Sequence, residues 1–127
     1  MSEITRIYYN KLVRDNIPDK IKSKREECEV RQICDVQEFQ QELLKIIKEE
    51  ATSLSMVRTK KDFLEEYSDL MVVFETIINQ LEITPEEVAA AREENYLKKG
   101  GYKHQHFLIW SEDVGYQSNE SPQGIPL

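Results

Sequence analysis

KEEATSL at residues 48–54 and LEEYSDL at residues 64–70 are two acidic stretches in strongly helical sequence, and a proline-free connection, residues 56–61, joins them. Such a short connection makes two helices antiparallel neighbours. Residues at equal distances from the centre of the turn, near Arg58 and Thr59, should then lie side by side. We therefore expect a mainly α protein, an antiparallel helical bundle of the all-α type with a small β element.

Several carboxylates of this hairpin fall on or beside its apolar faces. At about 100° per residue, Glu50 lies within the apolar face of the first helix. Glu66 lies within the apolar face of the second helix and Asp69 at its edge, whereas Glu65 points away. The apolar positions are Phe39, Leu43, Ile46, Ile47, Leu54 and Val57 in the first helix, and Phe63, Tyr67, Leu70, Met71, Val73, Phe74, Ile77, Ile78 and Leu81 in the second.

The turn should bring Glu50 level with residues 66–69, so several carboxylates would converge. Partly buried carboxylates repel one another unless they are paired, protonated or bound to a metal. Oxygen ligands on rigid helices suit a hard cation, Mg²⁺ or Mn²⁺. Alternatively, Lys or Arg side chains from elsewhere in the chain pair with these acids, and periodicity does not distinguish the two arrangements.

Length and charge narrow the classes of function. At 127 residues and 15.0 kDa the chain is expected to form one domain over residues 1–110. A net charge of −7 argues against nonspecific binding to nucleic acid. Neither a signal peptide nor a membrane-spanning segment is evident, so we expect a cytoplasmic protein that does not bind membranes. Cys28 and Cys34 are expected to be reduced structural thiols.

Capping signals predict the ends of the two long helices. Asp35, followed three residues later by Glu38, predicts a capping box that opens the first long helix, which should run to about Val57. Thr59 should cap the second long helix, which should continue to about Leu81.

Shorter elements are expected on both sides of the hairpin. A short helix should run from about Pro18 to Glu26, and Thr84 and Pro85 should open a third long helix that Gly100 and Gly101 end.

Alternating apolar residues predict a short strand at Glu29–Cys34, and the β-forming stretch His106–Trp110 predicts a second one that could pair with it or with residues 8–13. The polar composition from Ser111 onward predicts a loose tail, residues 111–127.

An opening motif and four further motifs in a fixed order resemble those of a known family. They are KLVRDNIP at residues 11–18, the two acidic stretches, NYLK at residues 95–98, and the Gly-Gly-aromatic stop at residues 100–102. The chain resembles the all-α nucleoside triphosphate pyrophosphohydrolases, in particular MazG-like and phosphoribosyl-ATP pyrophosphohydrolase-like proteins. The resemblance covers about residues 8–109.

The resemblance implies a Mg²⁺-dependent enzyme that cleaves a nucleoside triphosphate between the α and β phosphates, releasing a monophosphate and pyrophosphate. It implies three metal ligands, Glu50, Glu66 and Asp69, and one acid that orients or deprotonates the attacking water, Glu49. It also implies four residues that hold the nucleotide substrate, Lys11, Arg14, Asn95 and Lys98. These roles agree with metal-assisted hydrolysis, in which the cation screens the polyphosphate and cationic side chains stabilise the transition state.

Ser53 departs from the family pattern, which has a third acid at this position of the first helix. Either Glu42, Glu75 or a water replaces this acid, or the shorter, neutral hydroxyl means reduced metal affinity, altered specificity or lost activity. Two further interpretations of the whole chain stay open. The chain could be a non-catalytic nucleotide-binding or regulatory relative with a depleted metal site. It could also be a structural helical module whose acids only pair with basic residues.

The second long helix also predicts self-association. It is about 22 residues long and apolar over roughly half its circumference, which is more apolar surface than one small domain covers easily. We expect a homodimer or a homotetramer.

Overall fold

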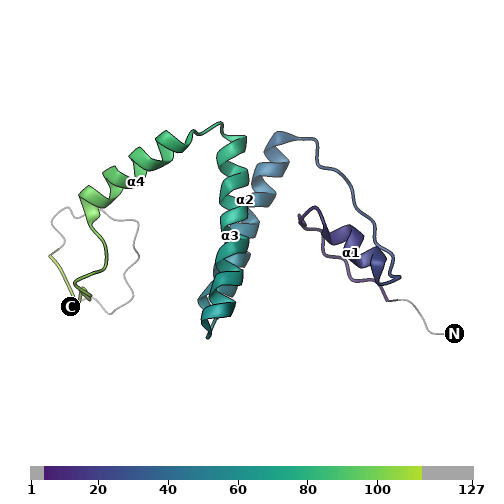
Figure 1. Cartoon of the computed structure of the whole chain (residues 1–127), viewed down its shortest axis with the longest axis horizontal. Helices are drawn as coiled ribbons and strands as arrows, with labels where there is room; N and C mark the ends of the chain where they lie inside the picture. The colour runs from purple at the N-terminus through teal and green to yellow at the C-terminus, as the bar shows by residue number, and fades with distance from the viewer. Residues whose placement is uncertain (1–4, 113–127) are drawn as a thin grey trace. The chain divides into compact units, whose positions relative to one another are not determined.

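The structure, a computed structural model, describes residues 5–112 and is mainly helical, as expected from the sequence. Its helices are α1 (Ile17–Ser23), α2 (Val36–Ser55), α3 (Lys60–Gln80) and α4 (Pro85–Lys99), drawn in Figure 1. The chain divides into two compact units, Met1–Val88 and Ala89–Leu127. The candidate site lies in the first unit.

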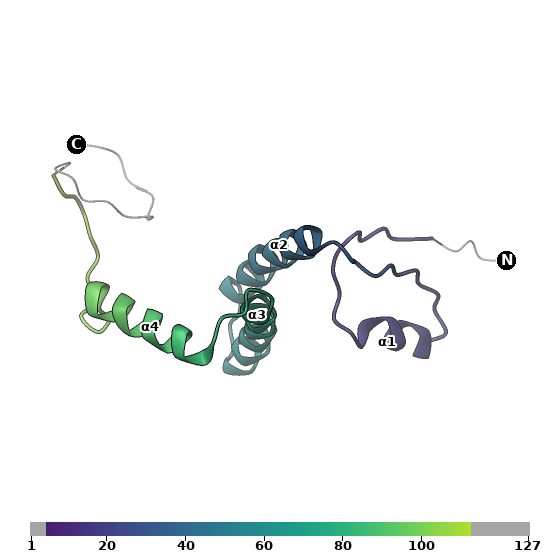
Figure 2. The same ribbon diagram turned by 90° about the horizontal axis from the view of Figure 1, so that it is seen from above.

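Helices α2 and α3 form the predicted antiparallel hairpin, and Figures 1 and 2 show them side by side. The pairing holds at the end far from the turn, where the Gln80 side-chain amide donates to the Val36 carbonyl over 3.2 Å. Val36 begins α2 and Gln80 ends α3, so the two helices match in length. The hairpin therefore fixes which residues of α2 face which residues of α3.

Side-chain caps start both helices of the hairpin, as predicted. The Thr59 hydroxyl accepts a hydrogen bond from the Asp62 amide over 3.0 Å, and the Asp35 carboxylate accepts one from the Gln37 amide over 3.4 Å. The Glu38 part of the expected capping box is wrong, however. Its carboxylate instead accepts two hydrogen bonds from the Arg31 guanidinium, over 3.0 and 2.9 Å. This bidentate pair holds the segment before α2 against its first turn.

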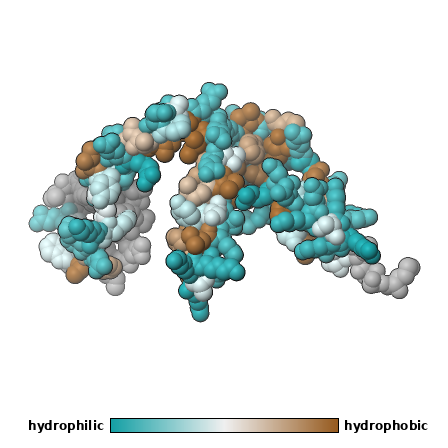
Figure 3. Space-filling view, in the orientation of Figure 1, coloured by the Kyte–Doolittle hydropathy of each residue, from teal (hydrophilic) through white to brown (hydrophobic). Residues whose placement is uncertain are grey.

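The core of the hairpin is small. Within residues 5–112, Leu43 of α2 and Val73 of α3 are the only buried apolar residues. Most other predicted positions of the α2 face are half-buried, but the apolar face of α3 is wider than α2 covers. Four of its residues, Phe63, Tyr67, Phe74 and Leu81, stay exposed by 37–51%. Apolar side chains are accordingly visible on the surface of the hairpin in Figure 3.

Helix α4 has the predicted start and stop. The Thr84 hydroxyl accepts a hydrogen bond from the Glu87 amide over 3.1 Å, and Pro85 is the first helical residue. At the other end Gly100 takes a φ of 73°, a left-handed conformation that glycine adopts without steric cost. Its amide donates to the Tyr96 carbonyl over 2.7 Å, which closes the last turn.

The predicted β element is wrong for the part of the chain that the structure describes. Residues 29–34 and 106–110 form no strand there, although the apolar alternation of the first segment and the β-forming residues of the second favour one. A strand is stable only when another strand satisfies its backbone groups, and neither segment has such a partner among residues 5–112. Both sequence signals reflect the preferences of single residues and contain no information about strand pairing.

Helix α1 is shorter than predicted and ends at Ser23, before Glu26. Arg25, two residues after this end, takes a left-handed φ of 61°, a conformation that cannot continue a right-handed helix. The predicted tail from residue 113 onward lies outside the described residues. None of the helices within residues 5–112 is long and apolar enough to cross a membrane.

Candidate metal-binding site

Three carboxylates converge between the two helices of the hairpin. Glu50 comes from α2, and Glu66 and Asp69 come from α3. One carboxylate oxygen of each lies within 4.8 Å of those of the other two. The register expected from the turn is confirmed, because Glu50 is level with residues 66–69. We call these three residues the acidic cluster.

The surroundings of Glu50 oppose the negative charge of its carboxylate. Partial burial on the apolar side of α2 raises the pKa of the Glu50 carboxyl. Hydrogen bonding with Glu66 raises this pKa further, as do the negative charges of Asp69, Glu66 and Glu49. The cluster therefore holds negative charge that a cation would stabilise.

Two basic side chains from the segment before α1 reach the same region. Arg14 Nη1 lies 3.5 Å from Asp69 Oδ1, and Lys11 Nζ forms an ion pair with Glu49 Oε1. All four side chains keep between 33% and 57% of their surface exposed. Ion pairs as exposed as these contribute about 0–1 kcal/mol each to stability. The motif at residues 11–18 thus lies beside the acids, although sequence spacing alone did not predict these pairings.

The alternative that basic residues neutralise the acids therefore holds for part of the site. Arg14 neutralises Asp69, and Lys11 neutralises Glu49, which lies next to the cluster. Within residues 5–112, Glu50 and Glu66 form no ion pair with any Lys, Arg or His. Two cluster carboxylates are thus left without a counter-ion from the described residues.

The donor set fits a hard divalent cation. All three donors are carboxylate oxygens, the ligand type that Mg²⁺ and Mn²⁺ prefer. At a metal–oxygen distance of about 2.1 Å, adjacent ligand oxygens of an octahedral Mg²⁺ are about 3.0 Å apart, so the three side chains would have to draw closer by up to about 2 Å to hold the ion. Waters or substrate oxygens would complete the coordination.

Ser53 is half-buried on α2, one turn after Glu50. Residues three apart on a helix lie on one side, so a longer side chain here would extend beside the cluster. The serine hydroxyl brings no charge to that position. Of the motif at residues 48–54 on α2, Glu50 is therefore the one residue that contributes a carboxylate to the acidic cluster.

The other predicted substrate-binding residues, Asn95 and Lys98, lie on the part of α4 that belongs to the second unit. Both are exposed, and Lys98 Nζ lies 3.2 Å from Glu94 Oε1, one turn earlier. This pair is an ordinary i, i+4 contact of a solvated helix face. A role for Asn95 and Lys98 in nucleotide binding stays a prediction.

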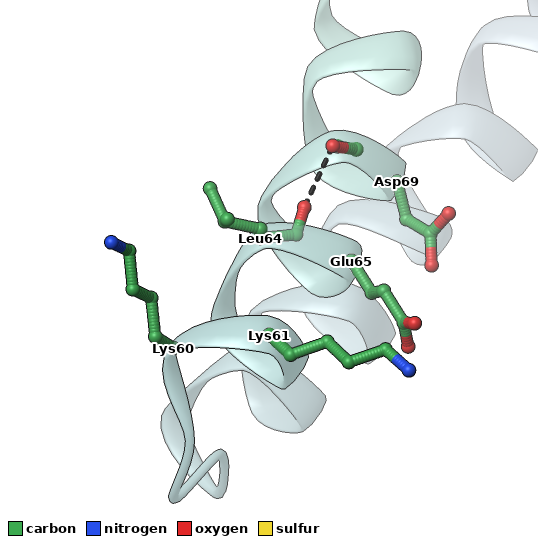
Figure 4. A pocket seen from close by; sticks show the side chains of 6 residues that line it. Lys60, Lys61, Leu64, Glu65 and Asp69 are labelled. Carbon is green, nitrogen blue, oxygen red and sulfur yellow. Dashed lines mark hydrogen bonds between the residues drawn. The ribbon is translucent and has the colours of Figure 1, made fainter.

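A shallow depression on α3 adjoins the acidic cluster through Asp69. It is lined by Lys60, Lys61, Leu64, Glu65, Ser68 and Asp69, which are all on α3. Figure 4 shows the side chains of Lys61, Glu65 and Asp69 extending to the same side of the helix. Their i, i+4, i+8 spacing could have identified Lys61 from the sequence as a cation on the flank of Asp69.

No family model, curated protein or solved structure matches this chain at a significant level. The resemblance to the all-α pyrophosphohydrolases therefore rests on the motifs in the sequence.

Proposed function

We propose that the protein is a Mg²⁺- or Mn²⁺-dependent nucleotide pyrophosphohydrolase, which cleaves a nucleoside triphosphate or a related phosphorylated nucleotide to a monophosphate and pyrophosphate. The observation that carries this proposal is the convergence of Glu50, Glu66 and Asp69 within 4.8 Å, from two helices whose register the turn sets. Lys11 and Arg14 beside these acids supply the positive charge that a polyphosphate needs.

In this proposal Glu50, Glu66 and Asp69 hold the cation. When bound, the cation screens the polyphosphate and acidifies a water molecule at the site. Glu49 is one residue from Glu50 and has an exposed carboxylate, so it could accept a proton from the attacking water once Lys11 turns to the substrate.

Lys11 and Arg14 would bind the phosphate oxygens and stabilise the charge that develops during cleavage. Asn95 and Lys98, which match the NxxK motif of the resemblance, would help to hold the nucleotide. The proposed setting is the cytoplasm, where nucleoside triphosphates and Mg²⁺ are both abundant, and the proposed form of the enzyme is a homodimer or homotetramer.

A second candidate function is nucleotide binding without turnover. Ser53 and the pairing of Arg14 with Asp69 favour it, because both reduce the negative charge offered to a cation. A third candidate is a structural helical module, which the Lys11–Glu49 and Arg14–Asp69 ion pairs also allow. The observation that favours the enzyme over the structural module is that Glu50 and Glu66 form no ion pair with a basic side chain within residues 5–112.

One experiment separates the three candidates. The purified protein is incubated with canonical and modified nucleoside triphosphates and Mg²⁺ or Mn²⁺, and released pyrophosphate is measured, with EDTA as the control. Cation-dependent release of pyrophosphate supports the enzyme. A nucleotide-induced rise in melting temperature without turnover supports the binding protein, since a ligand of the native state raises its stability. Neither turnover nor a thermal shift with any nucleotide supports the structural module.

A further inference from the structure

The segment before α1 is tied to both helices of the hairpin by side-chain charges. Lys11 binds Glu49 on α2 and Arg14 binds Asp69 on α3. No helix–helix contact joins α1 to the hairpin among the described residues. These two ion pairs are therefore the polar contacts that hold the segment at the acidic cluster.

The side chains around the acidic cluster carry a net negative charge, but they do not all favour a bare cation. Glu49 and the three carboxylates of the acidic cluster carry a formal charge of −4, and Lys11 and Arg14 contribute +2. The remaining charge of −2 would be neutralised by one divalent cation. However, Arg14 engages Asp69, so a bare cation must share that carboxylate with a guanidinium and is repelled by it.

A cation that arrives on a polyphosphate meets the opposite balance. Its phosphate oxygens bring negative charge, to which Lys11 and Arg14 can turn from Glu49 and Asp69. Arginine and lysine both bind phosphate oxygens strongly, arginine with two parallel hydrogen bonds. The same two cations thus oppose the free metal ion and attract the metal–polyphosphate complex.

We propose that Lys11 and Arg14 form an electrostatic filter, which disfavours a free divalent cation at the acidic cluster and favours the cation bound to a polyphosphate. The filter rests on the proposed function, since it selects the form in which the substrate and the cation enter the same site. It would keep the site from binding the abundant free cation unproductively.

Calorimetric titration of the full chain tests the filter with two probes, Mn²⁺ alone and Mn²⁺ with inorganic tripolyphosphate, which needs no knowledge of the base. The test variant is Arg14→Gln. The matched control is Arg6→Gln, which removes the same charge from the same segment, and Arg6 forms no ion pair with any of residues 5–112. Neither probe requires turnover.

Arg14→Gln should bind free Mn²⁺ about two- to fivefold more tightly and the tripolyphosphate complex about two- to fivefold more weakly, the range expected for one exposed charge pair. Arg6→Gln should match the parent with both probes. The differences should shrink as salt is raised.

Free Mn²⁺ binding that is unchanged or weakened by Arg14→Gln would overturn the filter while leaving the proposed enzyme intact. If neither the parent nor Arg14→Gln binds Mn²⁺ with or without tripolyphosphate, the metal-dependent function is itself wrong, and the filter with it. The two failures are therefore distinct.

Discussion

Glu66 is half-buried on the α3 face that packs against α2, and its position allows a direct test at the scale of one residue. Glu66→Gln keeps the shape of the side chain and removes its charge, so it should abolish cation-dependent turnover. It should also raise the melting temperature in EDTA, because one source of repulsion for Glu50 is lost. Pyrophosphate release and a thermal melt measure the two effects.

Glu65→Gln is the control for this prediction, since Glu65 is an exposed neighbour on the same helix that does not belong to the acidic cluster. Turnover of Glu66→Gln within a few-fold of the parent would contradict a role for Glu66 as a metal ligand.

Ser53 offers the reverse test, because a charge can be added beside the cluster. Ser53→Glu should tighten Mg²⁺ binding by about 1–3 kcal/mol, since a charged oxygen replaces a neutral one or a water. It should also lower the melting temperature in EDTA, because another carboxylate joins acids that already oppose ionisation of Glu50. Calorimetry and melts with and without Mg²⁺ should show both effects together.

Ser55→Glu is a suitable control, because Ser55 is exposed at the end of α2 and its hydroxyl donates to the Thr52 carbonyl, within the same turn of the helix. Equal Mg²⁺ affinity in the parent and Ser53→Glu would mean that position 53 faces away from the cation or that no metal site exists.

Among single residues, the acids were predictable from the sequence and their counter-ions were not. Helical periodicity and a short turn placed Glu50 level with residues 66–69, because both depend only on local geometry. The partners of Glu49 and Asp69 lie 38 and 55 residues away in sequence, in a segment without regular structure. No periodic rule connects such positions, so Lys11 and Arg14 were identified from a motif and their contacts only from the structure.

At the scale of elements, the first turn of α2 provides a prediction about pH. The Arg31 guanidinium, through its hydrogen bonds to the Glu38 carboxylate, holds the pKa of Glu38 below its ordinary value of 4.5. A carboxyl whose pKa is lower in the folded state than in the unfolded state stabilises the fold at pH values above its unfolded-state pKa. This stabilisation is lost as the pH falls through the folded-state pKa. Arg31→Gln should therefore lower the melting temperature slightly at pH 7, and the difference from the parent should vanish well below pH 4.5.

Thermal melts at several pH values measure this difference. Arg58→Gln is the control, since Arg58 is exposed in the turn and forms no ion pair within residues 5–112. A difference for Arg31→Gln that persists unchanged at low pH would contradict the stated cause.

The elements themselves were largely predictable where the cause is local. Thr59, Thr84 and Gly100 act through hydrogen bonds or dihedral angles within one helical turn, and the helices begin or end at them as expected. The strands failed because pairing is not local. The Glu38 part of the capping box failed because Arg31, seven residues away, competes for the same carboxylate.

At the scale of the whole molecule, the exposed apolar face of α3 predicts self-association. Phe63 and Tyr67 stack with ring centroids 5.9 Å apart, and Phe74 and Leu81 continue the same stripe, all at least 37% exposed. Such a contiguous apolar stripe is costly to leave in water. Light scattering after size-exclusion chromatography should give a mass of two or four chains of 15.0 kDa.

Phe74→Glu should shift this mass toward one chain, because it places a charge in the middle of the stripe. Leu44→Glu is the control, as Leu44 is an exposed apolar residue of α2 outside the stripe. A 15.0 kDa species of the parent at micromolar concentration would rule out the predicted oligomer.

The turn between α2 and α3 has a consequence for how this sequence can diverge. Its four residues, 56–59, include the last cap of α2 at Met56 and the first cap of α3 at Thr59. An added residue can bulge into solvent at little cost, because closure of a longer loop is only slightly less favourable. Deletion of one residue must either remove a cap or shift one helix along its axis relative to the other by about 1.5 Å, which would separate Glu50 from Glu66 and Asp69. Descendants of this chain should therefore tolerate longer turns and varied turn residues, whereas a shorter turn should persist only in lineages that no longer need the three acids together.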